Sequence, residues 1–312
     1  MRVKIVGSAA GGGFPQWNCA CPNCRSIRAG TFHGKPRTQA QLAISADSKH
    51  WFLLGASPDL RVQIESAPEL HPQGADDVTR HSPICGAVLL NADIDHVLGL
   101  LLLRELQPLN AYATVSVRRI LTEDNSMFVM LRRVEHQLIW HDIAPGKTFA
   151  LETPAGEDSG LRCRACSLGS HFPGYVSSKR IATLDTNEAS LGLVVVAPSG
   201  KRLAFMPAVP QITEELLSEL DRSDLLLFDG TFWSDDELIR IQGSGQTAKQ
   251  MGHVAIASPS GSLAQLAHLK RPRKIYIHIN NTNPMLDEDS PEYRQVRDAG
   301  WEIAEDGWQF EL

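Results

Sequence analysis

Long hydrophobic runs are absent from this sequence. The most apolar stretch, Val97 to Leu103, has seven residues, whereas a membrane-spanning helix needs about 20. The first residues do not read as a signal peptide either, because Lys4 interrupts the apolar run and glycines follow it. We therefore expect a cytoplasmic protein that does not insert into a membrane.

An excess of positive charge is also absent. Thirty Lys and Arg residues stand against 36 Asp and Glu residues, which gives a net charge of −6. No basic stripe of the kind that neutralises a phosphate backbone is present in the sequence. We therefore do not expect nucleic acid as a partner.

Nucleotide-binding and serine-hydrolase motifs are missing. The glycines between Gly7 and Gly13 follow an apolar run, but they lack the G-x-G-x-x-G spacing, and Pro15 and a cysteine cluster follow instead of a helix. Neither a P-loop nor a G-x-S-x-G elbow occurs. The sequence therefore contains none of the usual motifs for nucleotide binding or for a serine hydrolase.

Linkers, low-complexity tracts and internal repeats are absent as well, so we predict one domain over residues 1–312. Near-continuous apolar runs such as AVLL and DLLLF indicate strands buried on both faces, which suggests sheets covered by helices. Strands are predicted at Val3–Val6, Leu42–Ser45, Trp51–Leu54, Gly86–Leu90, Leu191–Ala197, Arg202–Phe205, Leu225–Phe228 and Lys274–Ile279, and helices at Asp95–Glu105, Glu123–Arg133, Gln211–Ser218, Ser262–Ala267 and Pro291–Ala299.

Three of the six cysteines form a cluster. Cys19, Cys21 and Cys24 have C-x-C-x-x-C spacing in a loop at about residues 16–27. In a chain expected in the cytoplasm, this spacing points to metal or redox chemistry before disulfides. A structural zinc takes four ligands in a tetrahedron, so the fourth ligand must come from elsewhere.

The other cysteines have no such pattern. Cys163 and Cys166 lie three apart in a segment predicted to be extended, so their side chains should point to opposite faces. Cys85, in the segment SPICGAVLL, lies beside an apolar run, so we expect it to behave as a small buried residue. No metal site is predicted for these three.

A second group of polar residues follows the predicted strand Gly86–Leu90. The segment NADIDHVLGL resembles the signature H-x-H-x-D-H-x-x-G-L of the metallo-β-lactamase superfamily, with Asp95 and His96 at its aspartate and last histidine. Asn91 and Asp93 stand where the first two histidines would be. The resemblance implies an α/β fold, an αββα sandwich in which two mixed sheets are covered by helices.

The rest of the superfamily pattern follows in order. His171 in GSHFPGY resembles the ligand of the third motif, and Asp229 in LLLFDGTFW resembles the bridging carboxylate. His278 in IYIHINNTNP resembles the final histidine. His253 in MGHVAIA takes the place of a histidine that, in related branches, transfers protons without binding metal.

The resemblance implies an altered metal centre. In superfamily members the changed positions serve the first metal site, so Asn91, Asp93 and His171 would line a vacated site, with Asp93 and His171 kept as candidate ligands. A centre with few imidazoles and open positions is typical of non-haem Fe(II) oxygenases rather than dinuclear hydrolases. The second site would be complete, with the ligands Asp95, His96, Asp229 and His278.

The sequence is similar, nearly end to end, to the coenzyme PQQ synthesis protein B family. The resemblance rests on the cysteine cluster and on the NADIDH, DGTFW, MGH and Y-x-H-I-N-N-T-N-P segments. It implies a role in pyrroloquinoline quinone (PQQ) biosynthesis, as an oxygenation or hydroxylation of a glutamate–tyrosine intermediate that depends on Fe(II) or another divalent metal. His253 and Asp95 would be its catalytic residues.

Two other functions stay open. A weakened catalytic motif is also consistent with a carrier that helps PQQ or its precursor to reach the periplasm, and residual hydrolase activity is a third possibility. The resemblance further implies a homodimer whose contacts involve the zinc loop. In phosphodiesterase relatives a histidine completes that zinc, and Asn281 occupies its position here, which leaves open whether Asn281 or another group is the fourth ligand.

Overall fold

The computed structural model describes residues 1–73 and 79–312. The chain divides into two compact units whose segments alternate along the sequence. Unit 1 comprises Met1–Val6, Gln41–Lys201 and Gly307–Leu312, and unit 2 comprises Gly7–Ala40 and Arg202–Asp306. Whether the whole chain behaves as one domain in solution stays a prediction.

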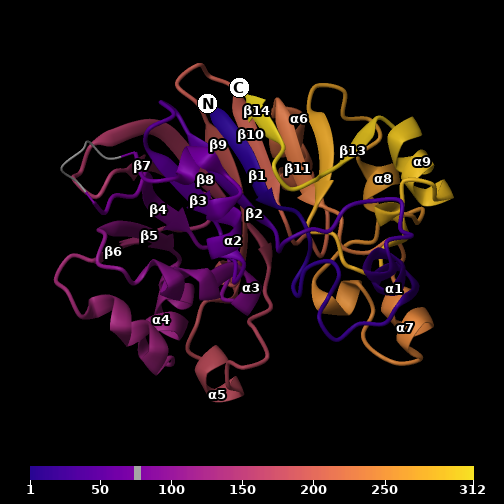
Figure 1. The fold of residues 1–312 in the computed structure, drawn as a ribbon, viewed down its shortest axis with the longest axis horizontal. Helices are drawn as coiled ribbons and strands as arrows, with labels where there is room; N and C mark the ends of the chain where they lie inside the picture. Colours follow the sequence, from indigo (N-terminus) through magenta and orange to yellow (C-terminus); the bar gives the residue numbers. More distant parts are fainter. Residues whose placement is uncertain (74–78) are drawn as a thin grey trace. The chain divides into compact units, whose positions relative to one another are not determined.

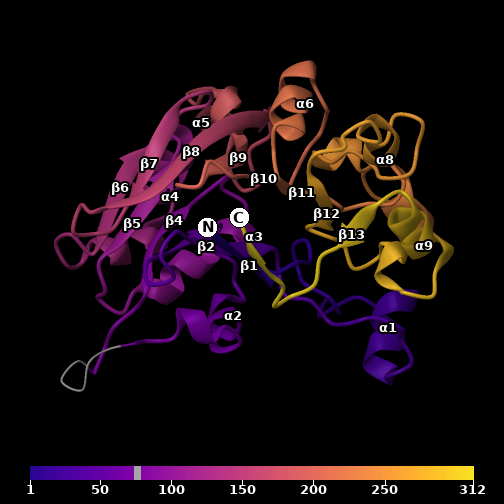
Figure 2. The same cartoon turned by 90° about the horizontal axis from the view of Figure 1, so that it is seen from above.

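Unit 1 carries a mixed sheet in which the two chain ends lie side by side. The first and last strands pair antiparallel, with Arg2 opposite Glu311 (Figures 1 and 2). Three neighbouring pairs, β3–β4, β4–β5 and β5–β6, are parallel. The strand order is β14 (Gln309–Glu311), β1 (Arg2–Gly7), β2 (Gln41–Ser45), β3 (Trp51–Leu54), β4 (Ile84–Val88), β5 (Leu109–Ala113) and β6 (Leu138–Asp142).

The central strands of this sheet are buried at every residue, as the unbroken apolar runs predict. One face is covered by helices that share a buried cluster with Trp51, Leu53 and Ala87. These helices are α2 (Leu60–Glu65), α3 (Ile94–Val97) and α4 (Val115–Glu123).

Unit 1 also contains three antiparallel strands, β7 (Thr148–Glu152), β8 (Asp158–Gly169) and β9 (Ser190–Val196). Within β8, Cys163 is buried and Cys166 is half-buried. The predicted extended segment is therefore confirmed, and the two cysteines are placed for opposite faces of the strand. The connection from β8 to β9 contains α5 (Ser178–Ile181).

Unit 2 is built on four parallel strands. β10 (Arg202–Met206), β11 (Leu225–Asp229), β12 (Arg273–Ile277) and β13 (Trp301–Ile303) are neighbours in that order. Parallel strands direct their carboxyl ends to one edge, which is where open α/β sheets place their sites. The helices of this unit are α1 (Pro22–Ala29), α6 (Glu214–Asp221), α7 (Glu237–Gln242), α8 (Ser262–Gln265) and α9 (Pro291–Asp298).

Most departures from the predictions concern helices. The predicted helix Asp95–Glu105 consists of the single turn α3 followed by a 3₁₀ helix at Leu98–Leu103. The reason is tertiary: the Gly99 backbone N–H donates to the Ala56 carbonyl at 2.8 Å instead of to its own helix. A Cβ on residue 99 would lie 2.1 Å from the Ser57 carbonyl oxygen, so only glycine allows this close approach.

The predicted helix Glu123–Arg133 was wrong in its bounds. α4 ends at Glu123, and a 3₁₀ helix at Ser126–Arg132 follows. α4 begins after Thr114, whose hydroxyl accepts from the Val117 backbone N–H, an N-cap that was not anticipated. All eight predicted strands are present, with ends shifted by up to two residues. Among the described residues, no helix is long and apolar enough to cross a membrane.

Candidate metal centres

The cysteine cluster is built around the first turn of α1. Cys21 is the N-cap of this helix, and its Sγ accepts from the Cys24 backbone N–H at 3.4 Å. The Cys19 Sγ accepts from the Cys21 backbone N–H, also at 3.4 Å. Pro22 at the first helical position fixes the backbone direction. The three sulfur atoms lie within 4.8 Å of one another, which confirms that this spacing gathers the thiols.

Asn281 supplies the fourth polar group. Its Nδ2 atom lies 3.1, 3.6 and 3.3 Å from the sulfur atoms of Cys19, Cys21 and Cys24. A tetrahedral zinc with bonds of about 2.3 Å to sulfur and about 2.1 Å to oxygen places its fourth ligand roughly 3.6 Å from each sulfur. Rotating the amide by 180° exchanges Nδ2 with Oδ1. The four side chains therefore fit a zinc ion with Oδ1 as the fourth ligand.

The thiols differ in their ionisation. Burial raises the pKa of Cys21 to about 12, and the neighbouring thiols add to this effect. Burial also opposes ionisation of Cys19, but hydrogen bonds from Cys21, Cys24 and Asn281 lower its pKa below the usual value. Zinc binds thiolates, so metal binding at this loop must release protons.

The segment from His278 to Asn283 connects the cysteine cluster to the end of β11. The Asn23 side chain donates to the backbone carbonyls of Asn281 and Asn283 at 3.2 and 3.0 Å. The Asn283 side chain in turn donates to the carbonyl of Gly230 at 3.0 Å. This segment thus supplies Asn281 to the cysteine cluster and His278 to a second group of polar residues.

The second group contains Asp229, His253 and His278, whose donor atoms lie within 4.8 Å of one another. Asp229 ends β11 and His278 directly follows β12, so the strand-end prediction is confirmed for both. His253 follows a left-handed Gly252 at the end of a 3₁₀ turn. All three side chains are buried.

Asp229 is surrounded by donors. Its Oδ1 accepts from the backbone N–H and the hydroxyl of Thr231 at 3.0 and 2.7 Å. Its Oδ2 accepts from the Val209 backbone N–H at 2.8 Å and contacts the His253 Nδ1 at 2.9 Å. A carboxylate has about four acceptor positions, so a metal bound by Asp229 has to replace or share one of these bonds.

His278 has a backbone φ of 58°. A residue other than glycine in this left-handed region costs of order 1–3 kcal/mol and persists only where the surroundings hold it. Here the carbonyl of His278 lies 2.8 Å from the Thr231 hydroxyl, and the next residue, Ile279, donates to the Ser8 carbonyl at 3.0 Å. The strained turn aims the imidazole into the buried group, and such strain is typical of functional sites.

Thr231 is a member of this site that the sequence motifs did not predict. Its hydroxyl contacts Asp229, His253 and His278. The only signal was a hydroxyl residue two positions after a carboxylate at a strand end. Such a residue is common in turns, so the signal had little specificity.

Five predicted site residues belong to unit 1. Asp93 precedes α3 without making a side-chain capping bond, and its backbone N–H donates to the Asn91 side chain at 3.0 Å. The His96 Nε2 lies 3.6 Å from the Asp95 Oδ2. His171 is exposed in the connection that follows β8. The ligand and lining roles predicted for Asn91, Asp93, Asp95, His96 and His171 stay predictions.

Tyr175, four residues after His171, connects this loop to the altered signature. Its hydroxyl donates to the Ala92 carbonyl. Burial and the nearby charge of Asp93 raise the pKa of Tyr175 to about 12. The loop of the third motif and the Asn91–Asp93 segment therefore meet within unit 1.

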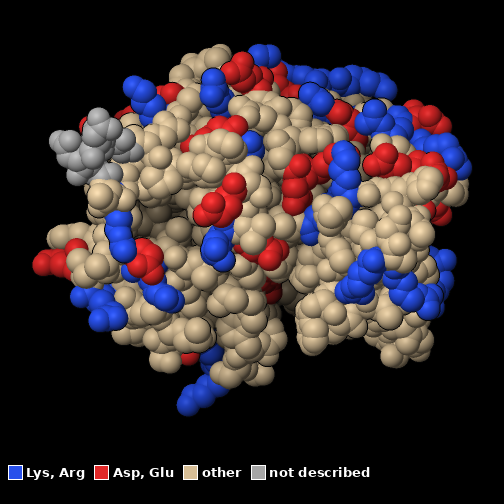
Figure 3. Space-filling view, in the orientation of Figure 1, with Lys and Arg blue, Asp and Glu red and all other residues tan. Residues whose placement is uncertain are grey.

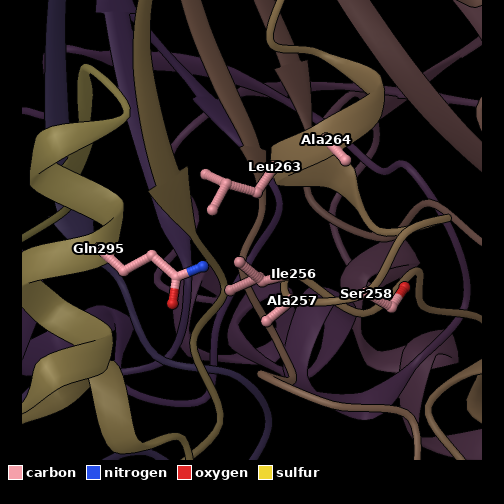
Figure 4. A pocket seen from close by; sticks show the side chains of 6 residues that line it. All are labelled: Ile256, Ala257, Ser258, Leu263, Ala264 and Gln295. Carbon is pink, nitrogen blue, oxygen red and sulfur yellow. The ribbon is translucent and has the colours of Figure 1, made fainter.

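Two further features of the described residues lie outside these groups of predicted ligands. On the face shown in Figure 3, basic and acidic side chains are interspersed rather than gathered in a stripe. A hollow in unit 2, between α8 and α9, contains no predicted ligand (Figure 4). It is lined by Ile256, Ala257, Ser258, Leu263, Ala264 and Gln295.

Comparisons with known proteins define the class. Residues 50–279 match the family described as beta-lactamase superfamily domain. A zinc-bound PqqB from Methylobacterium extorquens has a TM-score of 0.90 at 40% identity, with 100% of both chains covered. A diphosphatase of the PhnP family, at 17% identity with 100% of this chain and 97% of that chain covered, shares the fold with a TM-score of 0.66. The chain therefore has the predicted metallo-β-lactamase fold, two mixed sheets flanked by helices.

The relatives define the family within this class. Coenzyme PQQ synthesis protein B from Methylorubrum extorquens is 40% identical over 312 residues, and that from Rhodopseudomonas palustris is 42% identical over 314 residues. Each comparison covers 100% of both chains. The chain belongs to the coenzyme PQQ synthesis protein B family, as the sequence motifs predicted.

Proposed function

We propose that this protein acts in PQQ biosynthesis as a divalent-metal-dependent oxygenase that hydroxylates a tyrosine-derived glutamate–tyrosine intermediate. Membership of a family named for PQQ synthesis supports the pathway. The observation that carries the reaction class is the donor set, in which Asn91 and Asp93 replace two imidazoles while Asp229 and His278 lie together in a buried group. Such a carboxylate-rich, imidazole-poor set suits Fe(II) in oxygenases.

Asp95, His96, Asp229 and His278 are the proposed ligands of this metal. When bound, Fe(II) would supply the activation of O₂ that ring hydroxylation requires: one oxygen atom enters the ring and the other leaves as water, with two electrons from an external reductant. We propose that the polar residues of the altered first site contact the substrate instead of a second metal: Asn91, Asp93 and His171.

His253 is the proposed proton-transfer residue. Its Nδ1 is engaged by the Asp229 Oδ2 at 2.9 Å and the Thr231 hydroxyl at 3.0 Å. These contacts hold the imidazole plane, and proton exchange with substrate or water then takes place at Nε2. An imidazole suits this role because its ordinary pKa is close to neutral pH.

A structural zinc is proposed at the cysteine cluster, with Cys19, Cys21, Cys24 and the Asn281 Oδ1 as ligands. The zinc-bound state of the relative from Methylobacterium extorquens supports zinc in this family. We further propose a cytoplasmic homodimer whose contacts involve the zinc loop. Trp17, two residues before Cys19, supports such a contact because 85% of its surface is exposed, and large aromatic side chains are enriched at interfaces.

The test is anaerobic reconstitution with Fe(II), followed by exposure to O₂ with a glutamate–tyrosine conjugate, with and without an added two-electron reductant. We expect an O₂-dependent product that carries an additional oxygen atom, detected by mass spectrometry, and no product with an Asp229→Asn variant. Binding of the conjugate or of PQQ without turnover would support the carrier function instead. Cleavage of a phosphodiester by the same preparation would support a hydrolase.

A further inference from the structure

The Thr231 hydroxyl lies at the centre of the buried group in unit 2. Thr231 is 2% exposed. Its Oγ1 is 2.7 Å from the Asp229 Oδ1, 2.8 Å from the His278 Nδ1 and 3.0 Å from the His253 Nδ1. It is also 2.8 Å from the His278 carbonyl oxygen. One side chain therefore contacts every member of the group.

A hydroxyl has one proton to donate and two lone pairs that accept. The Asp229 carboxylate is the strongest of the available acceptors and also the closest, because hydrogen bonds to an ionised group are shorter and stronger than neutral ones. The proton of Thr231 therefore goes mainly to the Asp229 Oδ1, with the His278 carbonyl oxygen at 2.8 Å as its second acceptor. The lone pairs of the hydroxyl then face the two Nδ1 atoms. The His278 Nδ1–H donates to Oγ1 at 2.8 Å, while the His253 Nδ1–H is shared between Oγ1 at 3.0 Å and the Asp229 Oδ2 at 2.9 Å.

This assignment determines which nitrogen of His278 is available to a metal. A neutral imidazole carries its proton on one nitrogen and a lone pair on the other. If Nδ1 donates to Thr231, the lone pair is on Nε2. Ligating histidines are commonly held in this way, with the other ring N–H donated to a neighbouring acceptor that sets the tautomer.

We propose that Thr231 is a positioning residue that keeps His278 in the Nδ1–H tautomer and orients the Asp229 carboxylate, so that a divalent metal meets preformed donors. This inference rests on the proposed function, in which Asp229 and His278 are ligands. The backbone around Thr231 is itself restrained. The Asn280 backbone N–H donates to the Thr231 carbonyl at 3.1 Å, and the Gly230 N–H donates to the Ile277 carbonyl at 2.8 Å.

The experiment compares Thr231→Val, which removes the hydroxyl at similar volume, with Thr231→Ser, which keeps it. Co(II) is titrated into zinc-containing protein, and binding is followed by visible absorption. Because changes to residues that orient a ligand cost about 10-fold to 100-fold in metal affinity, we expect a loss of that size for Thr231→Val and affinity close to wild type for Thr231→Ser.

Thr114→Val is the matched control. It removes a buried threonine hydroxyl that caps α4 and donates to the Glu188 carbonyl at 3.0 Å, so it should lower stability without weakening Co(II) binding. Wild-type affinity in Thr231→Val, or an equal loss in Thr231→Ser, overturns the inference and leaves the proposed function intact. Failure of the wild-type protein itself to bind Co(II) overturns both.

A second measurement needs no folded variant at residue 231. In zinc-containing, ¹⁵N-histidine-labelled wild-type protein without added Fe(II) or Co(II), the ring nitrogen shifts of His278, assigned with a His278→Gln variant, report its tautomer. We expect Nδ1 protonated and Nε2 unprotonated. The opposite tautomer would mean that Thr231 donates to His278, and the inference would be wrong.

Discussion

The two groups of polar residues in unit 2 are held together in different ways. In the cysteine cluster, three of the four side chains come from one loop of six residues and contact mainly one another and Asn281. In the group of Asp229, His253 and His278, the members come from three separate segments. There, Val209 and Thr231 supply donors that satisfy the carboxylate without a metal.

This difference indicates which group depends on metal for its structure. Buried thiols at close range make weak hydrogen bonds, and their thiolates need a cation. A carboxylate with a full set of hydrogen bonds is already stable in the folded chain. We therefore expect loss of metal to destabilise the protein at the cysteine cluster, and to change binding and activity alone at Asp229, His253 and His278.

The largest expected effect is that of Cys21→Ser. Structural zinc contributes on the order of 10 kcal/mol of folding free energy in small metallodomains. We expect about one tightly bound zinc per chain in protein purified without added metal, and its loss in the variant together with a lower unfolding temperature. Metal analysis and thermal unfolding measure this.

Cys166→Ser is the control, because Cys166 is a half-buried thiol of β8. It should keep the zinc and its stability. A Cys21→Ser protein with an unchanged zinc content would contradict the zinc hypothesis. Zinc loss without any change in stability would contradict the proposed contrast between the two groups.

The next effect is that of His253→Ala on the reaction. A proton-transfer residue contributes about 10²-fold to 10⁴-fold to a rate, so turnover should fall by this factor while the metal content is kept. Single-turnover kinetics and metal analysis are compared on the same preparation. If the variant loses its active-site metal, His253 is a ligand and its proposed role is wrong; if neither quantity changes, it has no role in the reaction.

Replacing the proposed ligands tests metal binding by the same group. Asp229→Asn and His278→Ala should each lower Fe(II) affinity by about 10-fold to 100-fold or more, a lower bound set by changes to residues that only orient ligands. Asn91→Ala should be milder, because an amide is a weak ligand. Fe(II) titration of the three variants under anaerobic conditions decides this, and an Asn91→Ala loss as large as the others would place Asn91 among the ligands.

The smallest expected effect concerns Glu237, which supports the segment next to Asn281. Burial raises the pKa of this carboxyl to about 7, although hydrogen bonds from Thr282 and the Trp233 N–H oppose the shift. The folded protein thus binds this proton more tightly than the unfolded chain. The protonated carboxyl therefore adds to the free energy of unfolding. This contribution is fully present below the ordinary carboxyl pKa and is lost as the pH rises through about 7.

Glu237→Gln should remove this pH dependence. Relative to wild type, the variant should gain about 2 kcal/mol of unfolding free energy between pH 5 and pH 8. Urea unfolding at both pH values measures the difference. If the free energies of unfolding of variant and wild type differ by the same amount at pH 5 and pH 8, Glu237 is ionised in the folded protein at both pH values.

The sequence alone was sufficient to predict the types of donor and the elements that carry them. The C-x-C-x-x-C spacing is local, so a tight loop is enough to gather Cys19, Cys21 and Cys24. The apolar runs before Asp229 and His278 are long enough to predict buried strands, and parallel strands place their carboxyl ends together. The degenerate signature and these motifs were also sufficient to predict the family.

The way in which the donor atoms are held depends on tertiary contacts. The left-handed turn at His278, the contact between His253 and Asp229, the central position of Thr231 and the burial of Glu237 depend on segments far apart in the chain. The same is true of Gly99, whose contact with Ala56 replaces a helical hydrogen bond. A sequence pattern reports what each residue prefers locally, whereas the tautomer of an imidazole or the acceptor of a hydroxyl proton is set by the partner that packing brings to it.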